Sequence, residues 1–280
     1  MAIRRNEKLA YWLLPAVALP VGAWLLGRWL VARAVRGEVE KLFADPAAAP
    51  ANVYQPEQLA GLPPPVQRYF RRVLRPGQPY LRSVRLRHDG QFRAGLNQGW
   101  MPITGEEYFR ADAPGFVWVG TTASFTACDQ YVAGRGARRA WLLGALPVVR
   151  GQGAVYDQGE LLRWLAESVW FPTSLLPGAH VGWSPIDDRS ATLTLSDHRL
   201  TVVCVMHFNA EDEIGRGEMY RARYTTYSDR WVARYAAYRE WHGVRIPTQA
   251  EVTWEIDGVE HPYARFTVRV LDYAQPRAFD

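Results

Sequence analysis

The chain has 280 residues, of which 48% are hydrophobic, 13% aromatic and 22% charged. These proportions are typical of folded globular proteins and exclude a disordered chain. The net charge is +5, but residues 1–41, with seven basic and three acidic side chains, account for most of it, so the remaining residues lack the basic surface that nucleic-acid binding requires.

The first element is an uncharged run of 19 residues, Leu9–Gly27. As a helix rising ~1.5 Å per residue it would span about 28 Å, close to the ~30 Å hydrocarbon core of a bilayer. Aromatic residues stand near both ends of the run, as in an interfacial belt: Tyr11, Trp12, Trp24 and Trp29. We therefore predict a single-pass transmembrane anchor. A cleaved secretory signal is the alternative, which Arg28 and Arg33 directly after the run disfavour.

Basic residues flank the run equally on both sides, so charge does not decide its orientation. Residues up to Lys41 continue as a basic stalk, and residues 42–55 form a linker. Residues 56–280 are predicted to form one domain. It opens with an amphipathic helix over Pro56–Leu74, whose regular part begins at the prolines 63–65.

From Leu81 onward, short strand-like segments separated by turn signals dominate. The candidate strands are Leu81–Phe92, Trp100–Arg110, Phe116–Thr122, Thr126–Val132, Arg138–Leu146, Val181–Ile186, Ala191–Leu195, Leu200–Phe208, Gly217–Thr226, Trp231–Tyr238, Val244–Trp254 and Tyr263–Leu271. This series predicts a mainly β (α+β) fold, with a curved antiparallel sheet or half-barrel of about 11–12 strands and covering helices.

Two of these segments, Phe116–Val119 and Val202–Met206, are apolar at every position. A strand that is apolar on both faces must be covered on both. Helices on one side of the sheet, or an apolar cavity, would provide the second cover.

One helix, Asp157–Val169, interrupts the strands, and the apolar loop Thr173–Gly178 follows it. Large apolar residues gather in and around this segment: Trp118, Trp141, Trp164, Trp170, Phe171, Leu175, Leu176 and Trp183. Each is interpretable as ordinary core. Together they predict an apolar ligand cavity with the helix and loop as its lid.

Motifs for catalysis, phosphate binding and metal binding are missing from the sequence, so no catalytic residue, metal or cofactor is predicted. The acidic residues Glu160 and Glu167, with Arg163 between them, lie on one helix face. This spacing is usual for a solvated, ion-paired surface, and an acid–base pair is the alternative. Cys128 and Cys204 leave a disulfide undecided.

Several stretches resemble an uncharacterised bacterial family of membrane-anchored proteins. They are Leu62–Phe70 (LPPPVQRYF), Gly159–Pro172 (GELLRWLAESVWFP) and Gly243–Pro247, followed by Trp254 and Pro262–Tyr263. The order of elements is similar to the periplasmic lipoprotein-carrier fold, a half-barrel covered by helices. The resemblance implies a domain outside the cytoplasm, anchored in the inner membrane of the cell envelope, but it transfers no binding residue.

The sequence thus predicts a non-enzymatic protein that holds an acyl chain, a lipid or a lipoprotein. An envelope enzyme using Glu160 or Glu167 and an envelope sensor or assembly scaffold with a protein partner remain alternatives.

Overall fold

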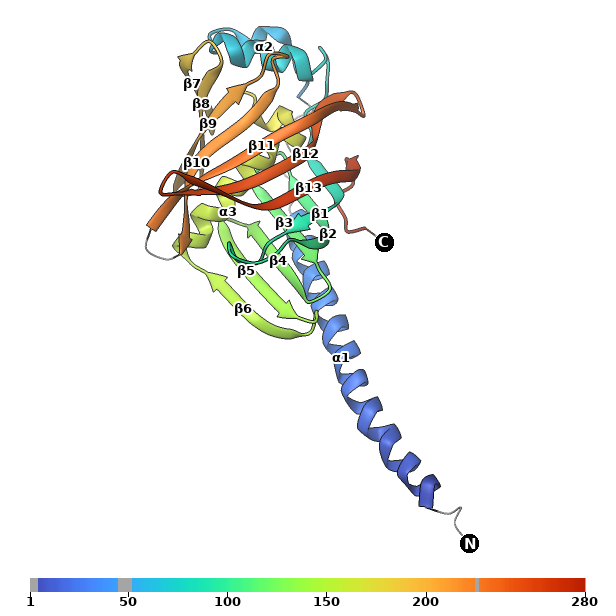
Figure 1. Cartoon of the computed structure of the whole chain (residues 1–280). Coiled ribbons are helices and arrows are strands. Elements are labelled where there is room, and N and C mark those ends of the chain that lie inside the picture. Colours follow the sequence, from blue (N-terminus) through green and yellow to red (C-terminus); the bar gives the residue numbers. More distant parts are fainter. Residues whose placement is uncertain (1–4, 45–51, 225–226, 280) are drawn as a thin grey trace.

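The computed structural model describes the backbone of residues 5–44, 52–224 and 227–279, and their side chains except for residues 5–20, 223–224 and 227. Thirteen strands form a single antiparallel sheet (Figure 1). They are β1 (Ser83–Phe92), β2 (Met101–Arg110), β3 (Gly115–Thr121), β4 (Phe125–Val132), β5 (Arg135–Leu142), β6 (Leu146–Gln152), β7 (Val181–Asp187), β8 (Ser190–Asp197), β9 (Leu200–Phe208), β10 (Ile214–Tyr224), β11 (Tyr227–Trp241), β12 (Val244–Ile256) and β13 (Val259–Tyr273).

The sheet is curved and open. Its order is β6-β5-β4-β3-β2-β1-β13-β12-β11-β10-β9-β8-β7, so two meanders are joined where the first strand pairs with the last. Within the described residues, β6 and β7 are the free edges. The predicted mainly β class and curved antiparallel sheet are confirmed.

The structure has one strand more than the twelve predicted. The segment predicted as Arg138–Leu146 divides into the end of β5, a tight turn and the start of β6. Leu143 and Gly144 both have positive φ, at 51° and 70°, as the primed turns of short hairpins require. Because the turn is apolar apart from its glycine, it carried no recognisable turn signal.

The helices are α1 (Arg5–Phe43), α2 (Pro64–Val73) and α3 (Ala154–Glu167), with the 3-10 helices η1 (Pro56–Leu59), η2 (Ser168–Trp170) and η3 (Pro172–Leu175). The regular helix α2 begins at the prolines, as predicted. The predicted lid helix corresponds to α3 and η2, and the apolar loop after it contains η3.

The two faces of the sheet are covered differently. We call the face against α2 and α3 the inner face, and it carries the large core, which includes Leu86, Phe116, Leu165 and Cys204. The opposite, outer face carries a small second core. There Val39 and Leu42 of α1 pack with Tyr108, Val117 and Cys128.

Both faces were predicted to be covered for the two strands that are apolar at every position, and this holds for β3 but not for β9. On β3, Phe116 and Trp118 face the inner core, whereas Val117 and Val119 face α1, so both faces are covered as predicted. On β9, Val202 and Cys204 lie in the inner core, but Val203 is 46% exposed. For β9 the predicted second cover is therefore wrong.

Helix α1 begins away from the domain and lies against it from Trp24 to its C-terminal end (Figure 1). Among the described residues, no helix combines the length and the apolar character that a membrane span needs. The side chains of residues 9–20, most of the predicted span Leu9–Gly27, lie outside the described residues. The anchor therefore stays a prediction.

The two cysteines are unpaired and buried on opposite faces of the sheet, Cys128 on the outer face and Cys204 in the inner core. Burial raises the pKa of the Cys128 thiol to about 12, so this side chain is an inert part of the core.

Candidate functional site

Helix α3 lies directly against the inner face because two strand glycines make room for its first turn. A Cβ at Gly136 would lie 2.1 Å from the Tyr156 carbonyl oxygen, and one at Gly151 would lie 2.1 Å from the Tyr156 ring. Asp157 Oδ1 then accepts a hydrogen bond of 2.7 Å from the Gly136 N–H. The helix contacts β3, β4, β5 and β6 on one side and β9 and β10 on the other, so it bridges the two ends of the sheet.

A buried cluster of ion pairs lies beneath α3. Arg163 is at its centre, with nitrogens 2.8 Å from Glu107, 3.1 Å from Asp129 and 2.8 Å from Glu167. Asp129 also binds Arg138 through two contacts of 2.8 and 2.9 Å. Glu160 binds Arg221 at 2.9 Å and lies 3.6 Å from Arg138. We call these seven side chains the ion cluster: Glu107, Asp129, Arg138, Glu160, Arg163, Glu167 and Arg221.

The ion cluster contains four carboxyl groups and three guanidinium groups. Burial, reinforced by the nearby Glu167 carboxylate, raises the pKa of Glu107 well above the ordinary value. For Asp129 the cost of burial is outweighed by Arg138 and Arg163, and its pKa is lowered. If all seven groups were ionised the ion cluster would carry one excess negative charge, and the raised pKa of Glu107 favours a proton on that carboxyl group.

His88 borders the ion cluster and is neutral. Its Nε2 accepts a hydrogen bond of 2.8 Å from the Trp118 indole N–H. Burial lowers the pKa of His88 to about 3, and the Arg163 guanidinium adds to the effect. This histidine therefore carries no charge at neutral pH and acts as an acceptor that orients Trp118.

The eight apolar residues predicted to line a cavity are placed differently from one another. Six are buried in the inner core: Trp118, Trp164, Trp170, Phe171, Leu175 and Leu176. Trp183 is half-buried against that core and donates to the Leu175 carbonyl, whereas Trp141 packs against the outer core. Neither of the two pockets described below is lined by any of them, and their predicted contact with a ligand stays a prediction.

The three polar residues predicted on the lid helix, Glu160, Arg163 and Glu167, all belong to the ion cluster, and they lie largely buried rather than solvated. Arg163 binds Glu167 as expected, whereas Glu160 pairs with Arg221 of β10 instead. The side chain of Glu160 is only 1% exposed. The interpretation as a solvated helix face is therefore wrong, because the strands supply arginine and carboxylate partners that the helix sequence alone does not reveal.

Apolar residues continue along the inner face beyond α3, on β4, β5 and β6. The first row across these strands consists of Phe125, Leu142 and Leu146, and the second of Ala127, Ala140 and Val149. The third row consists of Asp129, Arg138 and Gly151, which belong to or border the ion cluster. The surface thus changes from exposed and apolar at the β5–β6 turn to charged beside α3.

Aromatic rings from the centre of the sheet flank these rows. Phe92 meets Phe125 at a centroid distance of 5.9 Å and Tyr263 at 6.1 Å. Trp254 stacks on Tyr263, whose hydroxyl accepts a hydrogen bond of 2.8 Å from Trp231 Nε1. Phe92, Phe125, Trp254 and Tyr263 are all half-buried. We call the two apolar rows together with Phe92, Trp254 and Tyr263 the inner apolar surface.

The inner apolar surface is not predictable from the sequence alone. Its members come from strands separated by more than 100 residues and are joined only by the pairing of β1 with β13. The alternation of Phe125 and Ala127 on β4 is a detectable signal, but it does not reveal which rings lie opposite.

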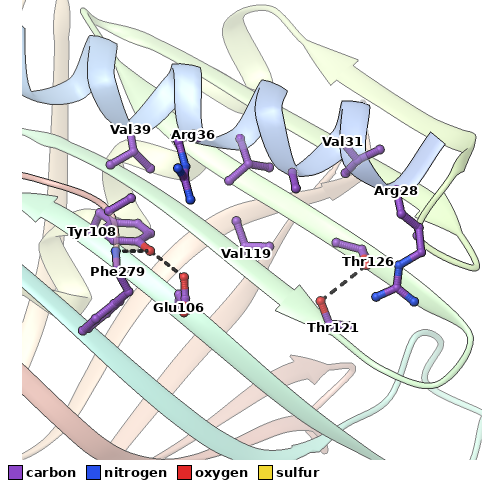
Figure 2. A pocket seen from close by; sticks show the side chains of 14 residues that line it. Arg28, Val31, Arg36, Val39, Glu106, Tyr108, Val119, Thr121, Thr126 and Phe279 are labelled. Carbon is purple, nitrogen blue, oxygen red and sulfur yellow. Dashed lines mark hydrogen bonds between the residues drawn. The ribbon is translucent and has the colours of Figure 1, made fainter. Parts of the chain in front are cut away.

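A pocket of about 260 Å³ lies between α1 and the outer face (Figure 2). Arg28 stands at one end beside Thr121 and Thr126, and Arg36 points toward the other end, where Tyr108 donates to Glu106 at 2.5 Å. Val31, Val35 and Val119 form its apolar wall. Within the described part of the chain, neither arginine forms a salt bridge, so this pocket presents two cations to an anionic group.

A second pocket, of about 380 Å³, lies over β11, β12 and β13 on the outer face. Its lining includes the ion pair between Arg265 and Glu251. Among the described residues, no cluster of histidine, cysteine and acidic side chains could hold a metal ion.

Two solved structures are similar to this chain at low identity. One is a LolA superfamily protein from Nitrosomonas europaea, with 9% identity and a TM-score of 0.42, covering 75% of this chain and 92% of that one. The other is a putative outer membrane lipoprotein-sorting protein domain from Vibrio parahaemolyticus, with 7% identity and a TM-score of 0.39, covering 69% and 86%. A search of curated proteins finds no match.

A protein-family model matches residues 52–266, which is most of the domain and includes α2, α3 and the strands of the inner apolar surface. The predicted membership of an uncharacterised family is confirmed, and no activity comes with it. This chain belongs to DUF6544, a family of unknown function.

Proposed function

We propose that this protein is a membrane-anchored binding protein that holds the acyl chain of a lipid or lipoprotein on its inner apolar surface. The observation that carries the proposal is the pair of apolar rows on β4–β6, which run from the exposed β5–β6 turn to the flanking rings of Phe92 and Tyr263. Covering such a half-buried apolar surface with an acyl chain is favourable by ~0.8 kcal/mol for each CH₂ group that is buried.

The ion cluster would set the inner limit of the binding surface. Arg138 lies in the third row, and its side chain is 42% exposed, whereas those of Arg163 and Arg221 are buried. An acyl chain would therefore stop at this row. An anionic group on the ligand would find a guanidinium there that already binds Asp129 in a fixed orientation.

The anchor belongs to the same proposal. The uncharged run Leu9–Gly27 with its flanking aromatic and basic residues would hold the domain at the inner membrane, with the residues after Lys41 outside the cytoplasm. Acyl chains would then be taken from, or delivered to, the bilayer beside the domain. A nucleic-acid partner is not proposed, because the domain is nearly neutral.

Photocrosslinking in membranes tests the binding surface. A diazirine fatty acid is supplied to cells that produce the full chain, and the modified residues are mapped by mass spectrometry. We expect adducts at Phe92 and Tyr263, because these rings flank the apolar rows. No adducts on the domain, or adducts on the α1 peptide alone, would contradict the proposal.

A matched pair of variants on one strand controls for folding. Ala140 lies on the inner face of β5 and Ala137 on its outer face, and both are half-buried. Ala140→Glu should lower the adduct yield at Phe92 and Tyr263 about tenfold, the effect of losing about two buried CH₂ contacts. Ala137→Glu should leave it within about twofold, and circular dichroism should show that both variants are folded.

An acid–base enzyme is the second candidate, because Glu160 Oε2 and Glu167 Oε2 lie buried without a hydrogen-bond partner among the described residues. Burial raises the pKa of both carboxyl groups. If this candidate is correct, Glu160→Gln abolishes a lipid-modifying turnover but retains crosslinking. If the binding proposal is correct, the same variant changes crosslinking only mildly and no turnover is found.

A further inference from the structure

Exposed apolar side chains are concentrated at one end of the molecule. Among the described residues, 11 of the 17 exposed large hydrophobic side chains lie in only two segments, residues 21–30 of α1 and residues 142–149 of the β5–β6 hairpin. In the hairpin they are Leu142, Leu143, Leu146, Val148 and Val149, with exposed fractions from 43% to 59%. Soluble surfaces rarely gather apolar side chains in this way.

The two segments touch each other and form one continuous patch. The indole N–H of Trp24 donates a hydrogen bond of 2.9 Å to the Leu143 carbonyl. Gly27 lies so close to Ala145 that an added Cβ would be 2.8 Å from the Ala145 Cβ. The hairpin turn is therefore held beside α1 at the point where the helix leaves the domain (Figure 1). We call the exposed residues of 21–30 and 142–149 the apolar patch.

Positively charged side chains border the apolar patch but are absent from its hairpin part. Residues 142–149 carry no charge, and Arg150 follows them directly. On α1, the Arg28 guanidinium lies 5.0 Å from the Trp24 ring centroid and the Arg33 guanidinium lies 5.4 Å from that of Trp29. Tryptophan and arginine together at the edge of an apolar surface are typical of the level of lipid headgroups.

The hairpin contains an edge strand, which limits how deep it can reach. Within the described residues, β6 pairs only with β5 and its other edge is free. The unpaired N–H and C=O groups along that edge need water or lipid headgroups as partners. Pro147 in β6 has no N–H, and proline within a sheet is confined to edge strands and bulges. These features suit an element at the boundary between headgroups and acyl chains, not one that crosses the bilayer.

We propose that the β5–β6 hairpin inserts shallowly into the same membrane leaflet from which α1 emerges, with Leu143 and Leu146 as its deepest residues. The lipid surface is the occupant because the patch continues directly into the uncharged run Leu9–Gly27. The inference rests on the proposed anchor. It adds a second contact, which would fix the orientation of the domain and bring the inner apolar surface next to the acyl chains.

Fluorescent labels at three positions test the proposal in the full chain. Leu143→Cys reports on the hairpin, Leu25→Cys on α1, and Ile186→Cys serves as the control, since Ile186 on β7 is 52% exposed and Leu143 is 51% exposed. Each variant is labelled with an environment-sensitive dye, which the buried native cysteines should not take up. The protein is reconstituted in vesicles of phosphatidylcholine with phosphatidylglycerol as the minor component, with and without brominated lipid.

A blue-shifted emission that brominated lipid quenches at both Leu143 and Leu25, but not at Ile186, would support the proposal. Quenching at Leu25 alone would overturn hairpin insertion and leave the anchor standing. Quenching at neither position would contradict both the proposed anchor and the proposed hairpin contact. A blue shift at Leu143 without quenching by lipid would show that a protein surface covers the patch, which also overturns the proposal.

Discussion

Arg163 shows how single residues determine this interior. It binds three carboxyl groups beneath α3, and its guanidinium also lies over the rings of Trp118 and Phe116 at 4.8 and 5.1 Å. Removing one partner of a buried ion pair costs more than replacing the whole pair, because an uncompensated charge is left behind. The seven side chains of the ion cluster are therefore coupled, and they fix α3 to both halves of the sheet.

The first prediction compares two carboxyl groups of the ion cluster. Glu107→Gln should cost less than about 1 kcal/mol of unfolding free energy, because a neutral carboxyl group and an amide are similar acceptors for Arg163. Asp129→Asn should cost about 3–5 kcal/mol, because Arg138 and Arg163 lose the charge that compensates them. Urea denaturation of the detergent-solubilised chain, followed by tryptophan fluorescence, measures both values. Equal losses in the two variants would show that Glu107 is ionised.

At the scale of elements, α1 belongs partly to the domain. The sequence indicates a stalk over residues 28–41, yet Val39 and Leu42 are buried on the outer face. The side chain of Leu42 fits over Gly115, where a Cβ would lie 2.9 Å from Leu42 Cδ1. Tyr54, in the predicted linker, is buried as well. Packing of the domain thus begins before residue 56.

The second prediction tests this contact. Leu42→Ala should lower the unfolding free energy of the domain by about 2–5 kcal/mol, because it removes a buried side chain and leaves a cavity. Leu30→Ala, on the same helix but 51% exposed, should change it by less than about 0.5 kcal/mol. The same denaturation assay applies. If both variants behave like the parent, α1 contributes nothing to the fold of the domain.

At the scale of the whole molecule, the exposed apolar side chains gather on one side, around the part of α1 that leaves the domain. The inner apolar surface starts at the same β5–β6 hairpin and ends at the ion cluster. The binding proposal and the hairpin proposal therefore share one geometry, in which the free end of the hairpin connects the bilayer to the inner face of the sheet.

The third prediction concerns the placement of the whole chain. The full-length protein should remain with the membrane pellet through washes with high salt and carbonate, since the run Leu9–Gly27 would be held by burial in lipid. A phosphatase reporter fused after Asp280 should be active outside the cytoplasm. Release of the full-length chain by carbonate would remove the anchor, and a reporter active only in the cytoplasm would reverse the topology.

The sequence by itself determined the local elements. Alternation and turn residues located twelve of the thirteen strands, and the prolines before Val66 located the start of α2. The motif stretches also identified the family. These features depend on neighbours within about ten residues, which is the range over which hydrophobic periodicity and turn chemistry act.

Only the tertiary structure decided which surfaces are covered. Trp170 and Phe171 are buried in the inner core, and Glu160 is a buried partner of Arg221, 61 residues away in the sequence. The inner apolar surface likewise depends on the pairing of β1 with β13. Burial and ion pairing are set by contacts between segments that are distant in the sequence. The periodicity of a helix or strand shows which residues share a face, but it does not show which other segment that face packs against.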